Sequence, residues 1–185
     1  MIGLVLAGGD SSRFGSDKAL YHLPGLGLSC AQLAVRKLRP FCHSILISAS
    51  QQNGSQLARQ TRFGGRTIFD QVPYDRHGPL SGIIAATSHF VGLHDYLILA
   101  VDYPLVSRVS LEDLVNHQQT FLVAGGRAHF TVCHLTISHQ QVVSWVQDHG
   151  WRLGQFMIKG CHCHPLVLSR SMELYNMNYN DGGFN

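Results

Sequence analysis

Charged residues are scarce in this 185-residue sequence, and long hydrophobic runs are absent. Asp, Glu, Lys and Arg make up 14% of the residues, and the cations are scattered rather than gathered into the basic run that tracks a nucleic acid. No stretch approaches the roughly 20 apolar residues that a membrane-spanning helix needs. The opening segment, MIGLVLAGG, lacks the basic first part of a signal peptide. We therefore expect a soluble, cytoplasmic protein that binds neither nucleic acid nor membrane.

The sequence also lacks the features of a disulfide scaffold or of several domains. Its five cysteines are an odd number, and its 45% of hydrophobic residues are enough to fill one sizeable core. Reduced thiols in the cytosol fit this composition better than disulfides do. Because there is no internal repeat, low-complexity segment or linker, residues 1–185 are expected to form a single domain.

Short β-branched runs alternate with amphipathic segments, which is typical of strands and helices around a parallel sheet. Strands are expected at Ile2–Leu6, Ile45–Ala49, Thr67–Phe69 and Tyr96–Val101. Helices are expected at Leu28–Leu38, Leu80–Phe90, Ser110–Gln119 and Ser138–His149. Ser110 and Asp113 have the spacing of a capping box at the third of these helices. The alternation predicts an α/β fold with a mainly parallel sheet.

The later part of the chain alternates less strictly. Phe121–Ala124 and His129–Leu135 flank Gly125-Gly126 and are expected to form a hairpin. Cys161–Leu168 is expected to return as a last strand, and the polar residues Asn176–Asn185 to end in a loop.

The first strand leads directly into a glycine-rich loop, Leu6–Lys18, at the sheet edge where open α/β folds bind ligands. Gly8 and Gly9 let backbone N–H groups approach an anion closely, and Arg13 and Lys18 would neutralise a triphosphate or the departing pyrophosphate. Neither a Walker loop nor G-x-G-x-x-G is present, so hydrolysis by a P-loop mechanism loses support. A glycine turn beside two solvated cations is the simpler alternative, but the spacing of Arg13 and Lys18 favours phosphate binding.

Two aspartates follow apolar strands at the same predicted edge. Asp102 comes just after Tyr96–Val101, which Pro104 terminates, and Asp70 follows Thr67–Phe69. Nucleotidyl transfer accumulates charge that Mg²⁺ neutralises, and Mg²⁺ prefers one or two carboxylates with phosphate oxygens and water. Asp102 is thus the first candidate for a metal ligand. The alternative for any one such Asp is a role in a turn or as a helix cap. Two aspartates at one edge, beside a cationic loop, make this alternative less attractive.

These motifs resemble the signature of the molybdenum cofactor guanylyltransferase family. Leu6-Ala7-Gly8-Gly9, Arg13-Phe14-Gly15 and Asp17-Lys18-Ala19-Leu20 resemble its LAGG, R-[MF]-G and DK-x-L segments. Related cytidylyltransferases tend to carry LAAG, so Gly9 favours guanine. The resemblance implies a three-layer α/β/α Rossmann-like nucleotidyltransferase fold.

The resemblance extends past the first loop. Asp70 with Gly78-Pro79-Leu80-Ser81-Gly82, and Val101-Asp102-Tyr103-Pro104, resemble the D…GPLAG and CD-x-P motifs. Ser48 stands where the family has Asn at the end of the second strand. The resemblance implies that Asp102 binds Mg²⁺. The residues that it implies for GTP binding are Leu6, Ala7, Gly8, Gly9, Lys18, Ser48, Asp70, Gly78, Gly82 and Asp102.

Two weaker motifs concern the acceptor. His129-Phe130-Thr131-Val132 resembles the family's H-P-T-I segment with Phe in place of Pro, and Leu174-Tyr175-Asn176-Met177-Asn178 resembles its F-x-N-[IV]-N motif. Alternate residues of an extended segment face the same way, so Asn176 and Asn178 are expected to point at one ligand. The helix that usually follows is replaced by Tyr179–Gly183.

The activity implied is Mg²⁺-dependent transfer of GMP from GTP to molybdopterin, with pyrophosphate released. Lys18, Asp102 and Arg13 would carry it by positioning and charge neutralisation. Residues 1–104 would bind the nucleotide and 105–178 the acceptor, with 179–185 as a tail; cofactor-delivery proteins are candidate partners. A related transferase using CTP or a sugar or alcohol phosphate, and a non-catalytic nucleotide-binding protein, remain alternatives.

One segment invites a different interpretation. Cys161-His162-Cys163-His164 holds four residues of the types that bind zinc. On a strand, however, the two cysteines face one side and the two histidines the other. We therefore expect a structural role for this segment. Of the twelve histidines, His77 and His129 lie nearest the predicted cleft.

Overall fold

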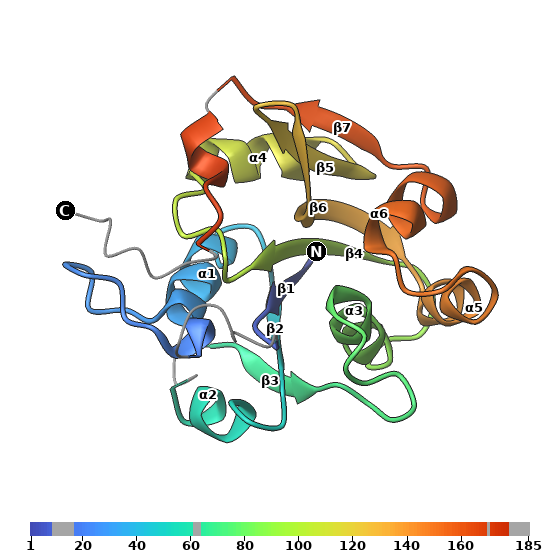
Figure 1. Cartoon of the computed structure of the whole chain (residues 1–185), viewed down its shortest axis with the longest axis horizontal. Coiled ribbons are helices and arrows are strands. Elements are labelled where there is room, and N and C mark those ends of the chain that lie inside the picture. Colours follow the sequence, from blue (N-terminus) through green and yellow to red (C-terminus); the bar gives the residue numbers. More distant parts are fainter. Residues whose placement is uncertain (9–16, 61–63, 170, 178–185) are drawn as a thin grey trace.

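The computed structural model describes residues 1–8, 17–60, 64–169 and 171–177, in which seven strands form one sheet between two layers of helices (Figure 1). The strand order is β3-β2-β1-β4-β6-β5-β7. All of these strands run in one direction except β6, which is antiparallel to β4 and β5. The strands are β1 (Ile2–Leu6), β2 (Ser44–Ala49), β3 (Arg66–Phe69), β4 (His94–Ala100), β5 (Thr120–Ala124), β6 (Arg127–Ile137) and β7 (His164–Val167).

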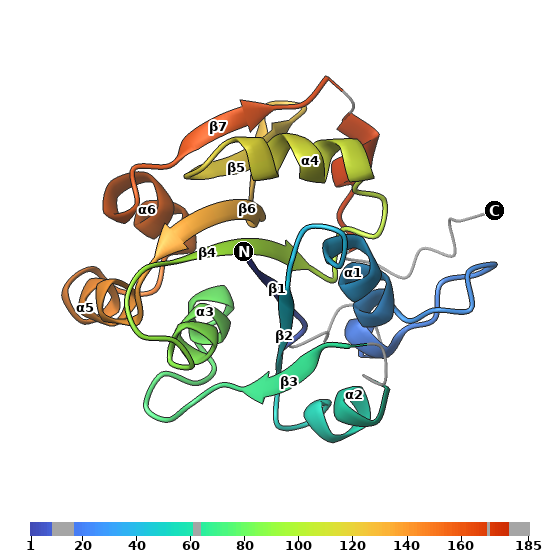
Figure 2. The same cartoon turned by 180° about the vertical axis from the view of Figure 1, so that it is seen from behind.

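Helices cover both faces of the sheet. Seen from opposite sides in Figures 1 and 2, α1 and α4 lie on one face, and α3, α5 and α6 lie on the other. The arrangement confirms the predicted three-layer α/β fold. The helices are η1 (Lys18–Leu20), α1 (Cys30–Leu38), α2 (Gly54–Gln60), α3 (Pro79–Thr87), α4 (Arg108–Asn116), α5 (His139–His149), α6 (Leu153–Gln155), η2 (Phe156–Gly160) and η3 (Ser171–Leu174).

The central strands are apolar on both sides because each helix layer encloses one of their faces. In β4, Leu97 and Leu99 belong to the core under α1 and α4, whereas Tyr96 and Ile98 belong to the core under α3 and α5. Full burial of one such side chain stabilises the fold by about 1.5–3 kcal/mol. A shift of the strand register by one residue would turn these side chains to the opposite face of the sheet and disrupt both cores.

The parallel register brings three strand ends to one edge. Leu6 at the end of β1 pairs with Ser48 on one side and with Ala100 on the other. The chain continues from these ends into the glycine loop, into the turn before α2 and into the turn that carries Asp102. This edge therefore gathers the segments that carry the sequence motifs.

The start of α4 differs from the prediction. Ser107, not Ser110, caps the helix, because its side chain accepts a hydrogen bond from the backbone N–H of Ser110. Ser110 lies inside the first turn and is buried, and its hydroxyl donates to Glu173 instead of closing a box with Asp113. The helix also ends at Asn116, before the expected Gln119, whose φ of 52° is incompatible with a right-handed helix.

The predicted last strand is shorter than expected. A π-helical turn, η2, ends at Gly160, and β7 begins only at His164. Cys161 and Cys163 are buried before the strand and share a thiol hydrogen bond, while His162 and His164 are exposed. The described residues contain no group of three or more His, Cys, Asp or Glu side chains placed to hold a metal ion. The strand geometry expected for Cys161 to Cys163 was wrong, because β7 begins after them, and the structural role of the segment stays a prediction.

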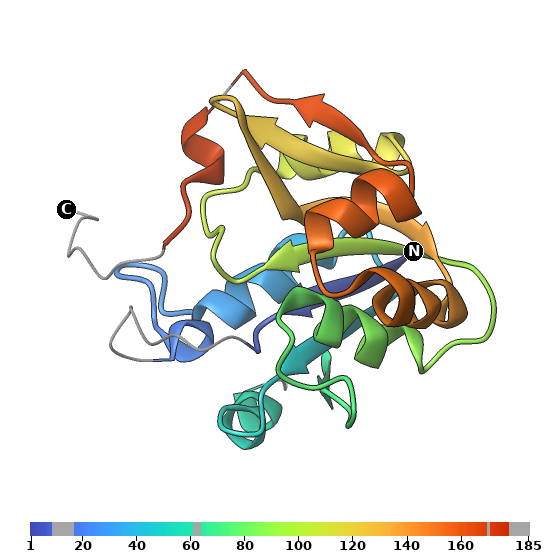
Figure 3. The same ribbon diagram turned by 45° about the vertical axis from the view of Figure 1, so that its right-hand side comes forward.

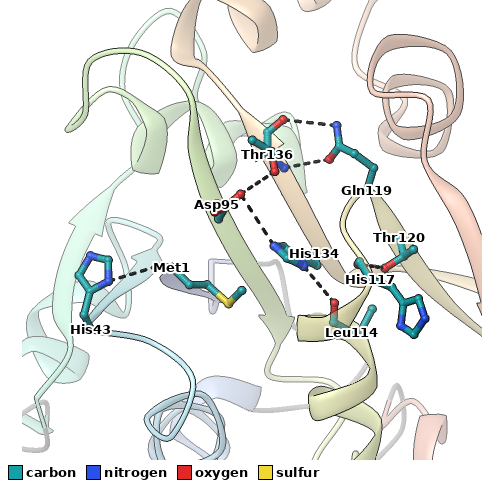
Figure 4. Close-up of polar contacts among 9 residues, drawn as sticks. All are labelled: Met1, His43, Asp95, Leu114, His117, Gln119, Thr120, His134 and Thr136. Carbon is teal, nitrogen blue, oxygen red and sulfur yellow. Dashed lines mark hydrogen bonds and ion pairs between the residues drawn. The ribbon is translucent and has the colours of Figure 1, made fainter.

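The hairpin of β5 and β6 is confirmed, and a partly buried polar cluster joins it to the beginning of β4 (Figure 4). Thr136 donates to Asp95 over 2.6 Å, and Gln119 accepts from the backbone N–H of Thr136. The ring of His134, fully buried, donates to the carbonyl oxygen of Leu114 at the end of α4. These contacts lie at the opposite end of β4 from Asp102 and hold α4 against the sheet.

No helix among the described residues is both long enough and apolar enough to cross a membrane.

Candidate active site

A cavity of about 240 Å³ opens at the edge where β1, β2 and β4 end. Its walls come from the first strand and loop, η1, the end of β2, the beginning of α3, the end of β4 with the turn after it, and one residue of β6. The lining residues are Leu6, Ala7, Gly8, Lys18, Ala19, Ser48, Gly78, Pro79, Gly82, Ala100, Val101, Asp102 and Thr131.

Lys18 and Asp102 form an ion pair at this cavity, with Lys18 Nζ 2.8 Å from Asp102 Oδ1. Asp17 positions the lysine, because its carboxylate accepts from the backbone N–H of Ala19 and caps η1. The Lys18 side chain is only 9% exposed, whereas the Asp102 side chain is 31% exposed. The carboxylate thus keeps access to solvent and to a ligand while the lysine lies beneath it.

The glycine loop begins as a narrow backbone strip against β2. The N–H of Ala7 donates to the carbonyl of Ser48, and the side-chain amide of Asn53 donates to the carbonyl of Ala7. A Cβ on Gly8 would lie 3.0 Å from the backbone of Ala49 and Ser50, a tight contact that favours glycine at this close approach. The buried Asn53 was not identified from the sequence, although an amide three residues after Ser50 is a recognisable turn signal.

The Gly78–Gly82 segment positions the beginning of α3 at the cavity. Gly78 caps the helix with a φ of 75°, a conformation that favours glycine, and Pro79 occupies the first turn. Ser81 accepts from the backbone N–H of His77. A Cβ on Gly82 would lie 2.5 Å from Ser48 Oγ, so this glycine allows the helix to pack closely on the end of β2.

Asp70 lies behind the cavity wall rather than in it. The hydroxyl of Ser48, which lines the cavity, donates to Asp70 Oδ1 over 3.3 Å. Burial raises the pKa of Asp70 to about 6, an effect that the Ser48 hydrogen bond opposes. Ser48 therefore stands between Asp70 and the cavity.

The two segments that are expected to bind the acceptor meet at Tyr103. Its hydroxyl lies 3.2 Å from His129 Nδ1 and shares hydrogen bonds with Thr131 and Asn176. The backbone N–H of Met177 donates to the carbonyl of Asp102 over 3.0 Å. Figure 3 shows the corresponding chain segment descending from η3 to the end of β4.

The structure brings most of the sequence-selected residues together. Leu6, Ala7, Gly8, Lys18, Ser48, Gly78, Gly82 and Asp102 line one cavity, and Asp70 and Asn176 contact residues beside it. Gly9, Arg13 and Asn178 lie outside the described residues. His77 is not in the lining, and its ring instead stacks on Trp151, with centroids 3.9 Å apart. Phe130, in the place of the family's Pro, packs against Phe121 at 4.7 Å.

Comparisons with known proteins show which family the sequence matches. Residues 3–177 match the MobA-like NTP transferase domain. A probable molybdenum cofactor guanylyltransferase from Thermococcus sibiricus is 31% identical, over 96% of this chain and 93% of that protein. Another so named, from Mycolicibacterium paratuberculosis, is 27% identical over 96% of this chain and 90% of its own.

Solved structures show the same fold. A molybdopterin-guanine dinucleotide biosynthesis protein A from Archaeoglobus fulgidus superposes with a TM-score of 0.68 at 17% identity, covering 98% of this chain and 94% of its own. A nucleotidyl transferase from Methanothermobacter gives a TM-score of 0.74 at 16% identity, covering 96% and 91% of the two chains. On the domain match and the full-length relative, the chain belongs to the MobA-like NTP transferase family and is a nucleotidyltransferase.

Proposed function

We propose that this protein transfers GMP from GTP to molybdopterin. An oxygen of the acceptor phosphate attacks the α-phosphorus of GTP, the bond to the β-phosphate oxygen breaks, and pyrophosphate leaves. The product is a guanine dinucleotide form of the cofactor. The observation that carries the proposal is the Lys18–Asp102 ion pair in the lining of a cavity that Leu6, Ala7 and Gly8 also line.

The residues of the cavity fit a nucleoside triphosphate. Leu6, Ala7 and Gly8 present backbone at the sheet edge, and Gly78 and Gly82 allow α3 to begin beside it. The beginning of α3 adds N–H groups and the positive end of the helix dipole, which favour phosphate. Lys18 supplies the cation on this wall, and Gly9 and Arg13 belong to the same proposed phosphate loop.

Asp102 also fits a divalent metal. Mg²⁺ takes one or two carboxylates and fills its remaining positions with phosphate oxygens and water, so one accessible carboxylate at a triphosphate cavity is sufficient. When bound, Mg²⁺ would neutralise charge on the phosphates. Asp102 would hold the ion, and Lys18 would hold both the carboxylate and the phosphates. Catalysis would then consist of positioning and charge neutralisation.

The acceptor would lie between Asp102 and the segments that carry Thr131 and Asn176. Residues 1–104 would thus serve the nucleotide and residues 105–178 the acceptor, with Asn176 and Asn178 toward the pterin. The proposal includes a cytoplasmic location and delivery of the acceptor by other proteins of cofactor synthesis, because the relatives carry names from that process.

The test is pyrophosphate release by the whole protein with molybdopterin and Mg²⁺, comparing GTP, CTP and ATP. We expect release and a guanine dinucleotide product with GTP alone, and none when EDTA replaces Mg²⁺. Release with CTP alone, or with a sugar phosphate in place of molybdopterin, would assign the protein to a related transferase. GTP binding without product, where a known guanylyltransferase turns over in the same mixture, would show a non-catalytic binding protein.

A further inference from the structure

The hydroxyl of Tyr103 is a junction between the turn that carries Asp102 and the two acceptor segments. The residue is only 7% exposed. Its ring meets that of His129 edge to face, with centroids 5.4 Å apart at 87°, and its hydroxyl lies 3.2 Å from His129 Nδ1. The same hydroxyl shares hydrogen bonds with Thr131 and Asn176. One phenol therefore joins β6, the C-terminal segment and the end of β4.

One of these partners lines the cavity, and the other belongs to a segment that contacts the Asp102 turn. Thr131 lines the cavity itself. Asn176 precedes Met177, whose backbone N–H donates to the carbonyl of Asp102 over 3.0 Å. The Tyr103 hydroxyl thus connects the cavity wall to a segment that is already tied to the proposed metal ligand.

Within the part of the chain that the structure describes, the side-chain oxygen of Asn176 lacks a hydrogen-bond donor. Its Oδ1 is buried and has no hydrogen-bond partner among the described residues. A buried carbonyl oxygen without a partner is unfavourable, so the bond to Tyr103 helps to hold the amide in this place. A ligand that carries N–H donors, as a pterin does, would supply the missing partner.

We propose that Tyr103 is a positioning residue for the acceptor, and that its hydroxyl orients Thr131 and Asn176 toward an N–H-bearing heterocycle next to Asp102. This inference rests on the proposed function and adds a residue that determines acceptor affinity. Tyr103 acts through its partners and does not itself touch the reacting atoms. A phenol hydroxyl has both a donor and an acceptor capacity, so it can serve several partners at once.

Tyr103→Phe tests this inference, because it keeps the buried ring and removes only the hydroxyl. In the full chain with GTP, Mg²⁺ and molybdopterin, we expect the KM for molybdopterin to rise about tenfold, the effect of one hydrogen bond lost between a misplaced Asn176 and the acceptor. The KM for GTP and kcat should stay within about twofold. The matched control is Tyr96→Phe, which removes a buried hydroxyl from β4 on the opposite core face and should leave both KM values unchanged.

Thr131→Val is a second variant, which removes the other partner of the hydrogen bond between Thr131 and Tyr103. It should raise the KM for molybdopterin as well, and adding Tyr103→Phe should raise it little further, because the two changes remove one shared contact. Fully multiplicative effects would overturn the proposal. So would equal changes in the KM values for GTP and molybdopterin, or an unchanged acceptor KM in Tyr103→Phe. A wild-type protein without product would refute the proposed function and this inference together, whereas normal wild-type turnover with an unaffected variant refutes the inference alone.

Discussion

Lys18 Nζ and Asp102 Oδ1 lie 2.8 Å apart although one belongs to the first loop and the other follows the fourth strand. The parallel register of β1 and β4 explains why the two residues meet. Leu6 pairs with Ala100, and the chain turns at the same edge of the sheet after each strand. In the proposed function, a cation and a carboxylate placed in this way would serve one triphosphate and one metal ion. The ion pair is therefore the structural basis of the proposed chemistry.

Asp102→Asn should abolish Mg²⁺-dependent turnover and retain the fold. The amide oxygen can still accept from Lys18, but it lacks the charge that Mg²⁺ requires, and removal of such an electrostatic group costs about 100-fold or more in kcat. Pyrophosphate release measured against Mg²⁺ concentration tests this, with thermal melting as the check on folding. Asp113→Asn, an exposed carboxylate on α4, is the control. Full activity in the Asp102 variant would remove it as the metal ligand.

Gly82→Ala tests the close packing of α3 on β2. Alanine inside a helix usually gains about 1 kcal/mol over glycine, but here its Cβ would meet Ser48 Oγ at 2.5 Å and Leu6 Cδ2 at 2.9 Å. Overpacking of this kind costs about 1–3 kcal/mol, so the net effect on the free energy of unfolding should be a loss. Chemical denaturation measures it.

The contact with Ser48 can be relieved in the same experiment. In a Ser48→Ala background, Gly82→Ala should cost clearly less, because the clashing oxygen is gone. An equal cost in both backgrounds would show that the packing against Ser48 does not limit this position.

Asp70→Asn should change the pH dependence of stability. The folded pKa of about 6 lies above the ordinary value of 3.8 because the carboxyl is buried, so the folded state holds its proton more tightly than the unfolded state. This contribution to stability is complete below about pH 4 and is lost as the pH rises through about 6.

Melting temperatures between pH 4 and pH 7 measure this effect. The wild type should lose stability relative to Asp70→Asn over that interval, while GTP affinity of the variant falls if Asp70 serves the nucleotide through Ser48. Asp148→Asn, an exposed carboxylate on α5, should parallel the wild type. Parallel curves for the wild type and Asp70→Asn would contradict the raised pKa.

Sequence patterns predicted the parallel half of the fold well for a physical reason. Strands enclosed on both faces leave continuous apolar runs, as in Ile2–Leu6, and their ends mark the ligand edge. Weakly patterned elements were missed. Helix α2 buries Leu57 as its only large apolar side chain, and Ser107 was overlooked as a cap because Ser110 offered a similar motif.

Some residues of the candidate site were predicted from local sequence motifs, and others were not. Local motifs identified Lys18, Gly82 and Asp102 because glycines and charges follow strand ends. The junction at Tyr103 was not predicted, since its partners, such as His129, lie far along the chain and meet it only after β6 has turned back beside β4. Contacts of this kind depend on tertiary geometry and leave no spacing to detect.

Glu173→Gln should loosen the C-terminal segment. Glu173 Oε2 accepts from the hydroxyl of Ser110 over 2.6 Å and from the backbone N–H of Ser107 over 3.2 Å, at the positive beginning of α4. Hydrogen bonds to a charged group contribute about 1.5–3 kcal/mol, so we expect a measurable loss in the free energy of unfolding. The carboxylate also raises the pKa of Lys37, against a burial effect that lowers it to about 8.

The functional consequence follows from the position of Met177, four residues beyond Glu173. A loosened segment holds Asn176 less firmly beside Asp102, so the KM for the acceptor should rise several-fold while the KM for GTP stays nearly constant. Glu112→Gln is the matched control, because its exposed pair with Arg108 contributes only about 0.3–0.5 kcal/mol. Steady-state kinetics and denaturation of both variants decide the matter. If the two glutamine variants have the same acceptor KM and the same free energy of unfolding, the Glu173 contact does not hold the C-terminal segment at the site.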